Sequence, residues 1–347
     1  MPCRDGPVGR LYRDLYRRFI FYPDVLSVPD DLTQRDPDVR VLAPSSLANL
    51  GPGFDTLGLA IGGLDDTVEA WITDTPGVHV VPSVGGASWT LPPDDKNTAA
   101  IGAVSVLEHA GADIGLVLRV TKAVTPGSGL GSSAASAVGG AYAAAMALGM
   151  DDSDETKASL IEAVLQGEAA ASGAWHGDNA LPSLFGGLVL VSSTDPTRYH
   201  RLTLGAPLHI AVILPQVQVL TKAARAMLPA VVPLRDAVSN ATHLAFLIGA
   251  LERGDVEEAG RCIMQDRLVE PVRSGLVPCY EPVRRAAQDA GAAGVALSGS
   301  GPAMFAFCRS GLHAARVAEA MREASEAHGI SAFATAAHAC EEGVRKA

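Results

Sequence analysis

The sequence predicts an α+β protein built from two successive α+β units. The chain has 347 residues, of which 48% are hydrophobic, enough apolar material for one large core or two. From Val39 onward, strand-like stretches with alternating apolar residues are interspersed with stretches of helical spacing. A turn-rich segment, STDPTRYHRL, separates the two series, so a domain boundary is expected near residue 205.

The first unit is expected to span residues 39–205. Its strands are predicted from alternation and β-branched content, and its helices from capping residues and terminal glycines. Asn97 or Thr98 caps the first helix and Gly111 ends it. The expected elements are, in order, strands at 39–44, 66–73 and 116–124 with that helix between the last two, helices at 132–149 and 155–172, and a strand at 185–193.

The second unit is expected to span residues 206–347. The same signals predict a strand at 209–215, helices near 221–229, 237–254, 256–264 and 280–291, strands at 294–298 and 303–308, a helix at 313–329 and a final strand at 331–337.

Residues 1–38 differ from the rest and form an N-terminal extension. Within RLYRDLYRRFIFYPDV, six apolar side chains share one helical face with arginines elsewhere: Leu11, Tyr12, Leu15, Tyr16, Phe19 and Ile20. This pattern predicts a short helix that packs on the body or on a second subunit. A basic membrane-surface anchor is the alternative.

Charge and cysteine content restrict the partners and the compartment. The net charge of −11 gives no broad attraction to nucleic acid or to anionic lipid, so neither is expected as a partner. The chain has no apolar run of the ~20 residues that cross a bilayer, and its N-terminus lacks the apolar region of a signal peptide. Its five cysteines form no CxxC pair and are odd in number, which fits a reducing, cytoplasmic setting.

The stretch TPGSGLGSSAAS, residues 125–136, places three glycines directly before a helix. Free N–H groups and the positive dipole at a helix N-terminus make such a loop an anion cradle, most often for phosphate. A tight turn without a ligand is the alternative. The loop lacks the GK[ST] ending of a Walker A motif and the GxGxxG spacing of dinucleotide-binding folds, and no GxSxG nucleophile elbow occurs in the right context.

PGSGLGSSAAS resembles the phosphate-binding loop of the GHMP kinase superfamily, whose pattern is PxxxGLGSSAA. APSSLANLGPGFDTLGLAI resembles the superfamily's first motif, and its NLGPGFD core is characteristic of homoserine kinases. GVALSGSGPAMFAF resembles the third motif. EAAASGAWHGDNALPSLFGG, TKAARAMLP and DRLVEPVR are similar to homoserine kinases in particular. The resemblance covers residues 39 to 307 and says nothing about the N-terminal extension.

This resemblance implies the two-domain GHMP kinase architecture. An ATP-binding domain like domain 2 of ribosomal protein S5 would occupy residues 39–205, a ferredoxin-like domain residues 206–347, and the active site the cleft between them. The implied activity is transfer of the γ-phosphoryl group of MgATP to L-homoserine, in threonine biosynthesis, by a homodimer. Two alternatives stay open: a superfamily kinase for threonine or another hydroxylated acid, and a non-catalytic sensor.

The resemblance also assigns the ATP and Mg²⁺ site. Ser133 and Glu168 would hold the metal, because magnesium takes oxygen ligands and keeps several waters. Other interpretations remain: Asn97 as a helix cap, Lys122 and Thr221 as surface residues, and Glu168 as a solvated carboxylate. The expected ATP contacts are Asn97, Lys122, Pro126, Gly127, Ser128, Gly129, Leu130, Gly131, Ser132, Ser133 and Thr221.

An amino-acid acceptor presents a carboxylate, which arginine binds bidentately, and an ammonium, which acceptor groups bind. Arg225 and Arg273 match the family's carboxylate-binding arginines, and Arg273 is preferred over Arg267 and Arg284 because it holds the EPxR position. The amino and hydroxyl ends would meet Asp55, His176 and the expected catalytic residues Asn49 and Asn179.

Two acceptor-site residues have other interpretations. Asp55 could cap the turn in GPGFDT, and His176 with Asp178 could form part of a metal site, although no third His or Cys ligand stands nearby.

The residue types also predict a mechanism. Asn179 cannot act as a base, and neighbouring residues such as Asp178 rarely point to the same spot. We therefore expect direct transfer, with the hydroxyl proton lost late to solvent or to a γ-phosphate oxygen. The second glycine run, SGSGPAMF, is expected to support the phosphate loop by close backbone approach and not to contact the substrate.

Overall fold

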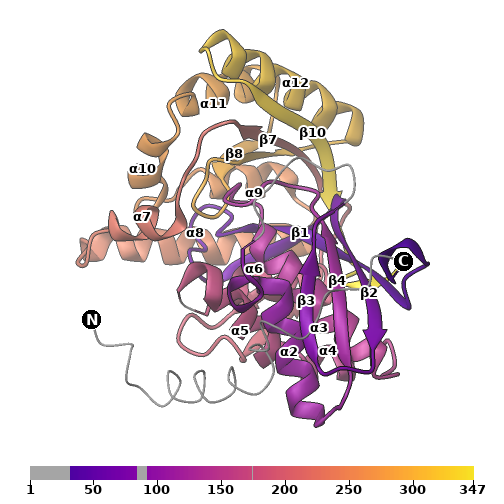
Figure 1. Ribbon diagram of the computed structural model, residues 1–347. Coiled ribbons are helices and arrows are strands. Elements are labelled where there is room, and N and C mark those ends of the chain that lie inside the picture. The colour runs from indigo at the N-terminus through magenta and orange to yellow at the C-terminus, as the bar shows by residue number, and fades with distance from the viewer. Residues whose placement is uncertain (1–31, 84–91, 174) are drawn as a thin grey trace.

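The computed structural model describes residues 32–83, 92–173 and 175–347. The amphipathic helix predicted within residues 11–20 lies outside this part of the chain. Figure 1 shows the N-terminal helices at one end of the molecule and the C-terminal helices at the other, with strands running between them. The α+β prediction for the fold class is confirmed.

One sheet runs through both halves of the described chain. Its longest path runs in the order β11 (Arg345–Lys346), β1, β2, β10, β7 (His209–Pro215), β9 (Met304–Cys308) and β8 (Gly294–Leu297). Strands β3 (Gly77–Val81), β4, β5 and β6 (Tyr199–Leu202) join through side branches. The centre is β2 (Leu57–Thr73), which pairs with β1 (Val39–Ala48), β4 (Gly115–Thr121), β5 (Leu188–Val191) and β10 (Ala332–Ala339). Strand β2 therefore fixes both halves relative to each other.

The N-terminal half packs helices on β1 and β2. Helix α3 (Ser132–Ala147) is rich in alanine and glycine, and α2 (Thr98–Ala110) approaches it closely: a Cβ on Gly140 would lie 2.1 Å from the carbonyl oxygen of Ala99. The remaining elements of this half are β3 (Gly77–Val81), η1 (Leu32–Gln34), η2 (Asp94–Lys96), α2 (Thr98–Ala110), α3 (Ser132–Ala147), α4 (Asp154–Ser159), α5 (Ile161–Ser172), α6 (Gly177–Phe185) and β6 (Tyr199–Leu202).

The C-terminal half places α11 (Tyr280–Asp289) and α12 (Gly311–Ala327) over β7 (His209–Pro215), β8 (Gly294–Leu297) and β9 (Met304–Cys308). Its other elements are α7 (Thr221–Ala226), α8 (Leu234–Arg253), α9 (Val256–Ile263), α10 (Glu270–Arg273) and η3 (Ser274–Leu276). Residue 205, the predicted boundary, lies in the connection between β6 and β7.

A hydrophobic cluster joins the two halves. Leu47 and Ile61 from the first half pack in one core with Val212, Leu247 and Phe305 from the second, all fully buried. The chain end returns to the first half as well, because β11 (Arg345–Lys346) pairs with β1. The halves are consequently held together by a shared core and a shared sheet.

Most predicted elements are present, and the differences have local causes. The helix predicted at 155–172 is two helices, α4 and α5, that meet at Leu160. The strand predicted from residue 66 begins at Leu57, since the glycines of GLAIGG hid its alternation. Helix α6 was not predicted, because it carries Pro182 within nine residues. Strands β3, β6 and β11 were not predicted either, because they are short.

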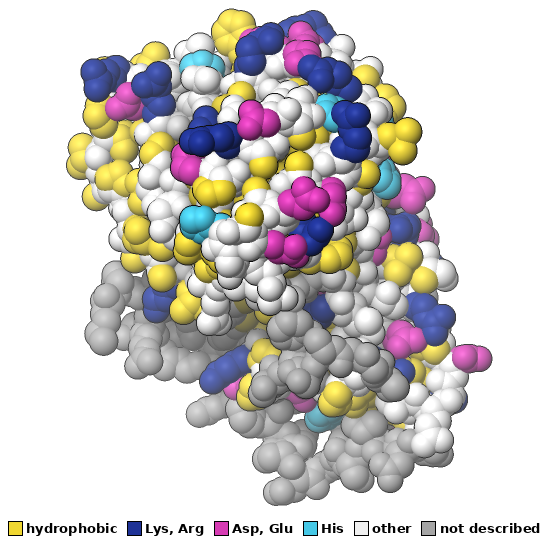
Figure 2. All heavy atoms as spheres, turned by 90° about the horizontal axis from the view of Figure 1, so that it is seen from above, with side chains coloured by type: hydrophobic (Ala, Val, Ile, Leu, Met, Phe, Trp, Pro, Cys, Tyr) yellow, Lys and Arg dark blue, Asp and Glu magenta, His cyan; other side chains and the backbone are white. Residues whose placement is uncertain are grey.

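The visible surface over the C-terminal half mixes both signs of charge. In Figure 2, basic and acidic side chains are interspersed on this face. Several arginines of the C-terminal half pair with glutamates one turn away on the same helix, as Arg322 does with Glu319 and Glu326. Within the described residues, no helix combines the length and apolar character needed to span a membrane.

Candidate active site

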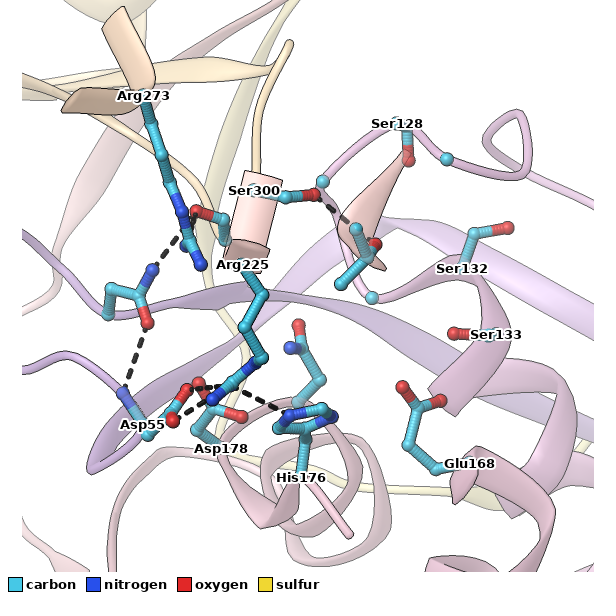
Figure 3. A pocket seen from close by; sticks show the side chains of 17 residues that line it. Asp55, Ser128, Ser132, Ser133, Glu168, His176, Asp178, Arg225, Arg273 and Ser300 are labelled. Atoms are coloured by element: carbon cyan, nitrogen blue, oxygen red, sulfur yellow. Dashed lines mark hydrogen bonds and ion pairs between the residues drawn. The ribbon is translucent and has the colours of Figure 1, made fainter. Parts of the chain in front are cut away.

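A pocket between the two halves collects residues from all three sequence motifs. It is lined by Asn49, Asp55, Gly127, Ser128, Gly129, Gly131, Ser132, Ser133, Glu168, His176, Asp178, Asn179, Thr221, Arg225, Arg273, Gly299 and Ser300. Figure 3 shows Asp55, Arg225 and His176 grouped on one side, and Ser132, Ser133 and Glu168 on the other. The pocket therefore has a charged end and an end formed by the glycine loop.

The glycine loop has the backbone conformation that its sequence requires. Gly127, Gly129 and Gly131 have φ values of 75°, 82° and 66°, in the left-handed region that favours glycine. Gly131 is the N-cap of α3 and has no side chain to accept from the first N–H groups. Gly131, Ser132 and Ser133 line the pocket, so the N-terminus of this 16-residue helix, whose dipole end favours negative charge, lies at the pocket wall.

The second glycine run supports this loop, as predicted. Ser298 donates its hydroxyl to the carbonyl of Gly129 at 2.6 Å, and a Cβ on Gly129 would lie 2.6 Å from the Ser298 carbonyl oxygen. The backbone N–H of Ala303 donates to the Ser128 carbonyl at 3.0 Å. Gly299 and Ser300 also line the pocket, so this run is not confined to the supporting role.

Lys122 lies behind the loop and does not line the pocket. Its ammonium donates to Asp66 Oδ2 at 2.8 Å, to Ser136 Oγ at 2.7 Å and to the carbonyl of Ser132. Asp66 is fully buried and also accepts from the Ala123 N–H at 2.9 Å. This buried pair ties β2 to the start of α3. The direct phosphate contact expected for Lys122 does not agree with this geometry, because its three donors already have partners.

Glu168 and Ser133 lie side by side at the glycine-loop end. Glu168 comes from α5, is only 5% exposed, and accepts a hydrogen bond from the Ser133 hydroxyl. Burial raises the pKa of Glu168 to about 7, and the bond from Ser133 opposes that rise. The solvated-carboxylate interpretation is wrong for this residue. A carboxylate and a hydroxyl beside an anion cradle match the oxygen ligands that Mg²⁺ takes.

The charged end is organised around Arg225, at the end of α7. One nitrogen, Nη2, donates to both carboxylate oxygens of Asp55, at 2.7 and 2.8 Å, and lies 2.8 Å from His176 Nε2. Burial, and next the charge of Arg225, lower the pKa of His176. The neutral imidazole can therefore accept this hydrogen bond.

Arg273 completes the charged end. It is 3% exposed, and its Nη1 donates to the Gly299 carbonyl at 2.9 Å. The guanidinium carbons of Arg225 and Arg273 lie 5.3 and 5.0 Å from the ring centre of Phe54, so one aromatic ring contacts both cations. Burial lowers the pKa of Arg273. The Nε groups of both arginines are buried and have no hydrogen-bond partner in the described structure.

The NLGPGFD loop between β1 and β2 adopts strained backbone conformations. Asn49, Leu50 and Asp55 have positive φ values of 73°, 45° and 55°. The Asn49 side chain holds this shape, because its Oδ1 accepts from the Asp55 N–H at 3.2 Å and its Nδ2 donates to the Gly299 carbonyl at 3.0 Å. Asn49 thus connects the first motif with the third.

Asp178 and Asn179, at the start of α6, both line the pocket. The premise that neighbouring residues would not face the same site is therefore wrong here. Ser46 donates its hydroxyl to Asn179 Oδ1 at 3.0 Å. Asp178 is 4% exposed, and burial, with the charge of Asp55 as a second cause, raises its pKa to about 7.

Four of the residues expected to contact ATP are not among those that line the pocket: Asn97, Lys122, Pro126 and Leu130. Asn97 is the N-cap of α2 and accepts from the N–H groups of Ala99 and Ala100. The Leu130 side chain is fully buried in the core between the halves. Arg267 and Arg284 do not line the pocket, which agrees with the preference for Arg273.

Sequence reasoning missed several residues that shape the pocket, namely Ser46, Phe54, Asp66, Gly299 and Ser300. All lie within or beside the three motifs, but only contacts across the fold give them these positions. Among the described residues, no three His, Cys, Asp or Glu side chains gather as a metal site, so His176 and Asp178 have no such partners there.

Comparisons with known proteins agree with this arrangement. The family model for the GHMP kinase N-terminal domain matches residues 98–187, and that for the GHMP kinase C-terminal domain matches residues 247–327. The chain is 43% identical over 294 residues to the homoserine kinase of Pyrococcus furiosus, covering 85% of this chain and 95% of that protein. The chain belongs to the homoserine kinase family of GHMP kinases.

Two further relatives illustrate the range of this family. The homoserine kinase of Methanococcus maripaludis is 37% identical over 271 residues, covering 77% of this chain and 86% of the relative. The crystal structure of homoserine kinase from Cytophaga hutchinsonii superimposes with a TM-score of 0.83 at 37% identity, covering 89% of this chain and 97% of that one. The protein is accordingly an ATP-dependent kinase that acts on an alcohol.

A more distant structure shows the fold alone. Mevalonate kinase of L. major, solved with R-mevalonate, gives a TM-score of 0.68 at 17% identity, over 86% of this chain and 94% of that one. The two-domain GHMP kinase architecture predicted from the motifs is confirmed.

The Lys122–Asp66 pair leads to a stability prediction. Lys122→Met should lower the free energy of unfolding by about 3 kcal/mol or more, because it leaves the buried Asp66 carboxylate without its cation. The double variant Lys122→Met/Asp66→Asn should recover a large part of that loss. Urea denaturation of the three proteins measures both effects. A Lys122→Met protein of unchanged stability but raised KM for ATP would instead indicate direct phosphate contact.

Proposed function

We propose that the protein transfers the γ-phosphoryl group of MgATP to the side-chain hydroxyl of L-homoserine, giving O-phospho-L-homoserine and ADP for threonine biosynthesis. The observation that carries this proposal is the pair of buried, unpartnered Nε groups on Arg225 and Arg273, in the same pocket as a phosphate loop. Buried guanidinium donors without partners favour an anionic ligand, and a carboxylate fits their planar geometry.

The glycine loop would bind the ATP phosphates. Its left-handed glycines let the backbone approach the ligand, and the N-terminus of α3 supplies N–H groups and a positive dipole end. The hydroxyls of Ser128, Ser132 and Thr221 line the same pocket and can add donors. Phosphoryl transfer needs mainly alignment and charge neutralisation, which these groups supply.

Glu168 and Ser133 would hold Mg²⁺, since together they present oxygen ligands beside the loop. The raised pKa of Glu168 supports this role, because a nearby cation would favour the ionised carboxylate that burial disfavours. When bound, the metal would neutralise charge that develops on the transferring phosphoryl group.

The charged end would bind the amino acid. Arg225 and Arg273 place two guanidinium groups against one Phe54 ring, and Asp55 is the carboxylate directly paired there. A substrate carboxylate would offset the second positive charge, and Asp55 with the neutral His176 would accept from the ammonium. Asn49 would keep Asp55 and the Gly299 turn in place.

Asn179 would lie near the acceptor hydroxyl. Its Oδ1 already accepts from Ser46, which leaves the Nδ2 hydrogens as the groups able to donate. An amide cannot take up the hydroxyl proton. We therefore retain direct transfer, with the proton passing late to solvent or to a γ-phosphate oxygen.

The acceptor specificity tests the proposed substrate. ADP release with MgATP should show a higher kcat/KM for L-homoserine than for L-threonine, L-serine or D-homoserine. A preference for L-threonine would refute L-homoserine as the substrate, and ATP binding without ADP release for any acceptor would favour a sensor.

The Glu168 carboxylate tests the proposed metal site. Glu168→Gln should lower kcat by about 100-fold or more, because it removes a charged group from beside the phosphates. Glu162→Gln, an exposed change on the same helix, is the matched control and should leave kcat unchanged.

Substitution of Asp178 tests the proposed direct transfer without a protein base. The Asp178 carboxyl, with a pKa of about 7, is partly ionised at neutral pH and lines the pocket next to Asn179 in the chain, so it is the competing base to test. Under direct transfer, Asp178→Asn should change kcat by less than about tenfold. Steady-state kinetics with L-homoserine and a thermal melt check rate and fold together. Collapse of kcat with KM and melting temperature preserved would mean that Asp178 is a base.

We further propose that the protein is a homodimer located in the cytoplasm. Exposed apolar side chains gather on α7, α8 and their connections, a surface that a second copy could cover: Leu220, Met227, Val231, Leu234, Val238 and Phe246. The four cysteines that the structure describes are free, in keeping with a reducing compartment.

The proposed dimer can be tested by measuring the molar mass in solution. Sedimentation equilibrium should give twice the chain mass of 35.7 kDa, and Val238→Glu should shift the protein toward the monomer. Leu312→Glu is the control, because Leu312 is also an exposed apolar residue (85%, against 56% for Val238) but lies on α12 and not on α7 or α8. A monomeric wild-type protein would contradict the proposal.

A further inference from the structure

The acceptor end of the pocket holds an ion pair made from its own two substrate-binding charges. Arg225 Nη2 lies 2.7 and 2.8 Å from the two oxygens of Asp55, although the residues are 170 positions apart in the chain. On the proposed function, on which this inference rests, Arg225 binds the substrate carboxylate and Asp55 its ammonium. The two groups therefore pair with each other before any substrate arrives.

The two partners differ in freedom to move. Asp55 sits at a strained backbone position, φ 55°, and its N–H is held by Asn49 Oδ1. The Arg225 side chain is 40% exposed and extends from the short helix α7. Its Nη2 donates to Asp55 and to His176, whereas its Nε has no partner in the described structure. Arg225, which Figure 3 shows between Asp55 and His176, is therefore the less constrained partner, and we infer that it shifts when a ligand enters.

Separating this pair has different consequences for different ligands. A carboxylate alone can pair with Arg273, but to engage Arg225 as well it must separate Arg225 from Asp55, and Asp55 then loses its hydrogen-bonded cation. An ammonium alone that takes Asp55 leaves Arg225 facing Arg273 without an anion. A zwitterion supplies a new partner to both groups at once, so each charge stays compensated.

We propose that the Asp55–Arg225 pair is the specificity determinant that restricts the acceptor to zwitterionic α-amino acids. Asp55 has two roles: it binds the ammonium of the correct acceptor, and it competes with any carboxylate that arrives without an ammonium. Hydroxy acids have the same hydroxyl and carboxylate as the amino acid but no ammonium. They are rejected because Arg225 stays paired with Asp55.

Two analogues of L-homoserine separate these roles. 4-Hydroxybutanoate lacks the ammonium, and 3-aminopropan-1-ol lacks the carboxylate; both keep the hydroxyl at the same chain distance. The wild-type protein and Asp55→Asn would be assayed with MgATP and each acceptor. Asn suits the strained position, since it tolerates left-handed backbone well, and a melting curve verifies that the variant folds.

Asp55→Asn should change kcat/KM for L-homoserine and kcat/KM for 4-hydroxybutanoate in opposite directions. For L-homoserine, kcat/KM should fall by about 30-fold or more, because a charge-assisted hydrogen bond is lost. For 4-hydroxybutanoate it should rise by about 5-fold, the effect of removing a competing, partly exposed ion pair. For 3-aminopropan-1-ol, whose ammonium needs Asp55, kcat/KM should fall. Asp65→Asn, which removes the same charge at a distant pair with Arg345, should change none of these values.

The outcomes are distinct. Unchanged activity toward 4-hydroxybutanoate would leave Asp55 as an ammonium ligand only, and a fall for all three acceptors would make its role structural; either result overturns the proposal. If the wild-type protein does not use L-homoserine, the proposed function fails. The ion pair is then tested by calorimetric titration of 4-hydroxybutanoate, which should bind Asp55→Asn more tightly than the wild type if the pair excludes it and equally if it does not.

Discussion

The close backbone contact between the glycine loop and the second glycine run is the constraint on which the pocket depends. Gly129 approaches the turn at residues 298–301 so closely that a Cβ there would lie 2.6 Å from one carbonyl oxygen and 2.9 Å from another. This contact joins the N-terminus of α3, from the first half, to the turn after β8, from the second. The proposed phosphate end and acceptor end are thereby set at a fixed separation, which phosphoryl transfer requires.

The same turn also positions the residues of the charged end. The Gly299 carbonyl accepts from both Asn49 and Arg273, and Asn49 in turn holds the Asp55 backbone. Behind the loop, the buried Lys122–Asp66 pair fixes the start of α3 to the central strand. Polar contacts of this kind are costly to bury unless every member has a partner, so the surrounding structure must position each of them.

Local sequence was a good guide where function depends on local backbone. The glycine loop directly precedes the N-terminus of α3, as predicted, with all three glycines in the left-handed region, and Asn97 caps its helix. Local sequence was a poor guide where distant residues decide the contacts. Lys122 stands next to the loop in sequence but turns to Asp66, 56 positions earlier. Asp178 and Asn179 both face the pocket, because Ser46 on β1 and the start of α6 meet there.

By itself the sequence determined the fold family, the order of the motifs and the types of group available for phosphate, metal and amino acid. Those properties follow from local conformation and from side-chain chemistry, which nearby residues specify. Only the tertiary structure decided which groups share the pocket and how they pair: Arg225 with Asp55, both arginines on Phe54, and Asn179 with Ser46. Strand register and packing between the halves set these contacts, and one motif in isolation does not contain them.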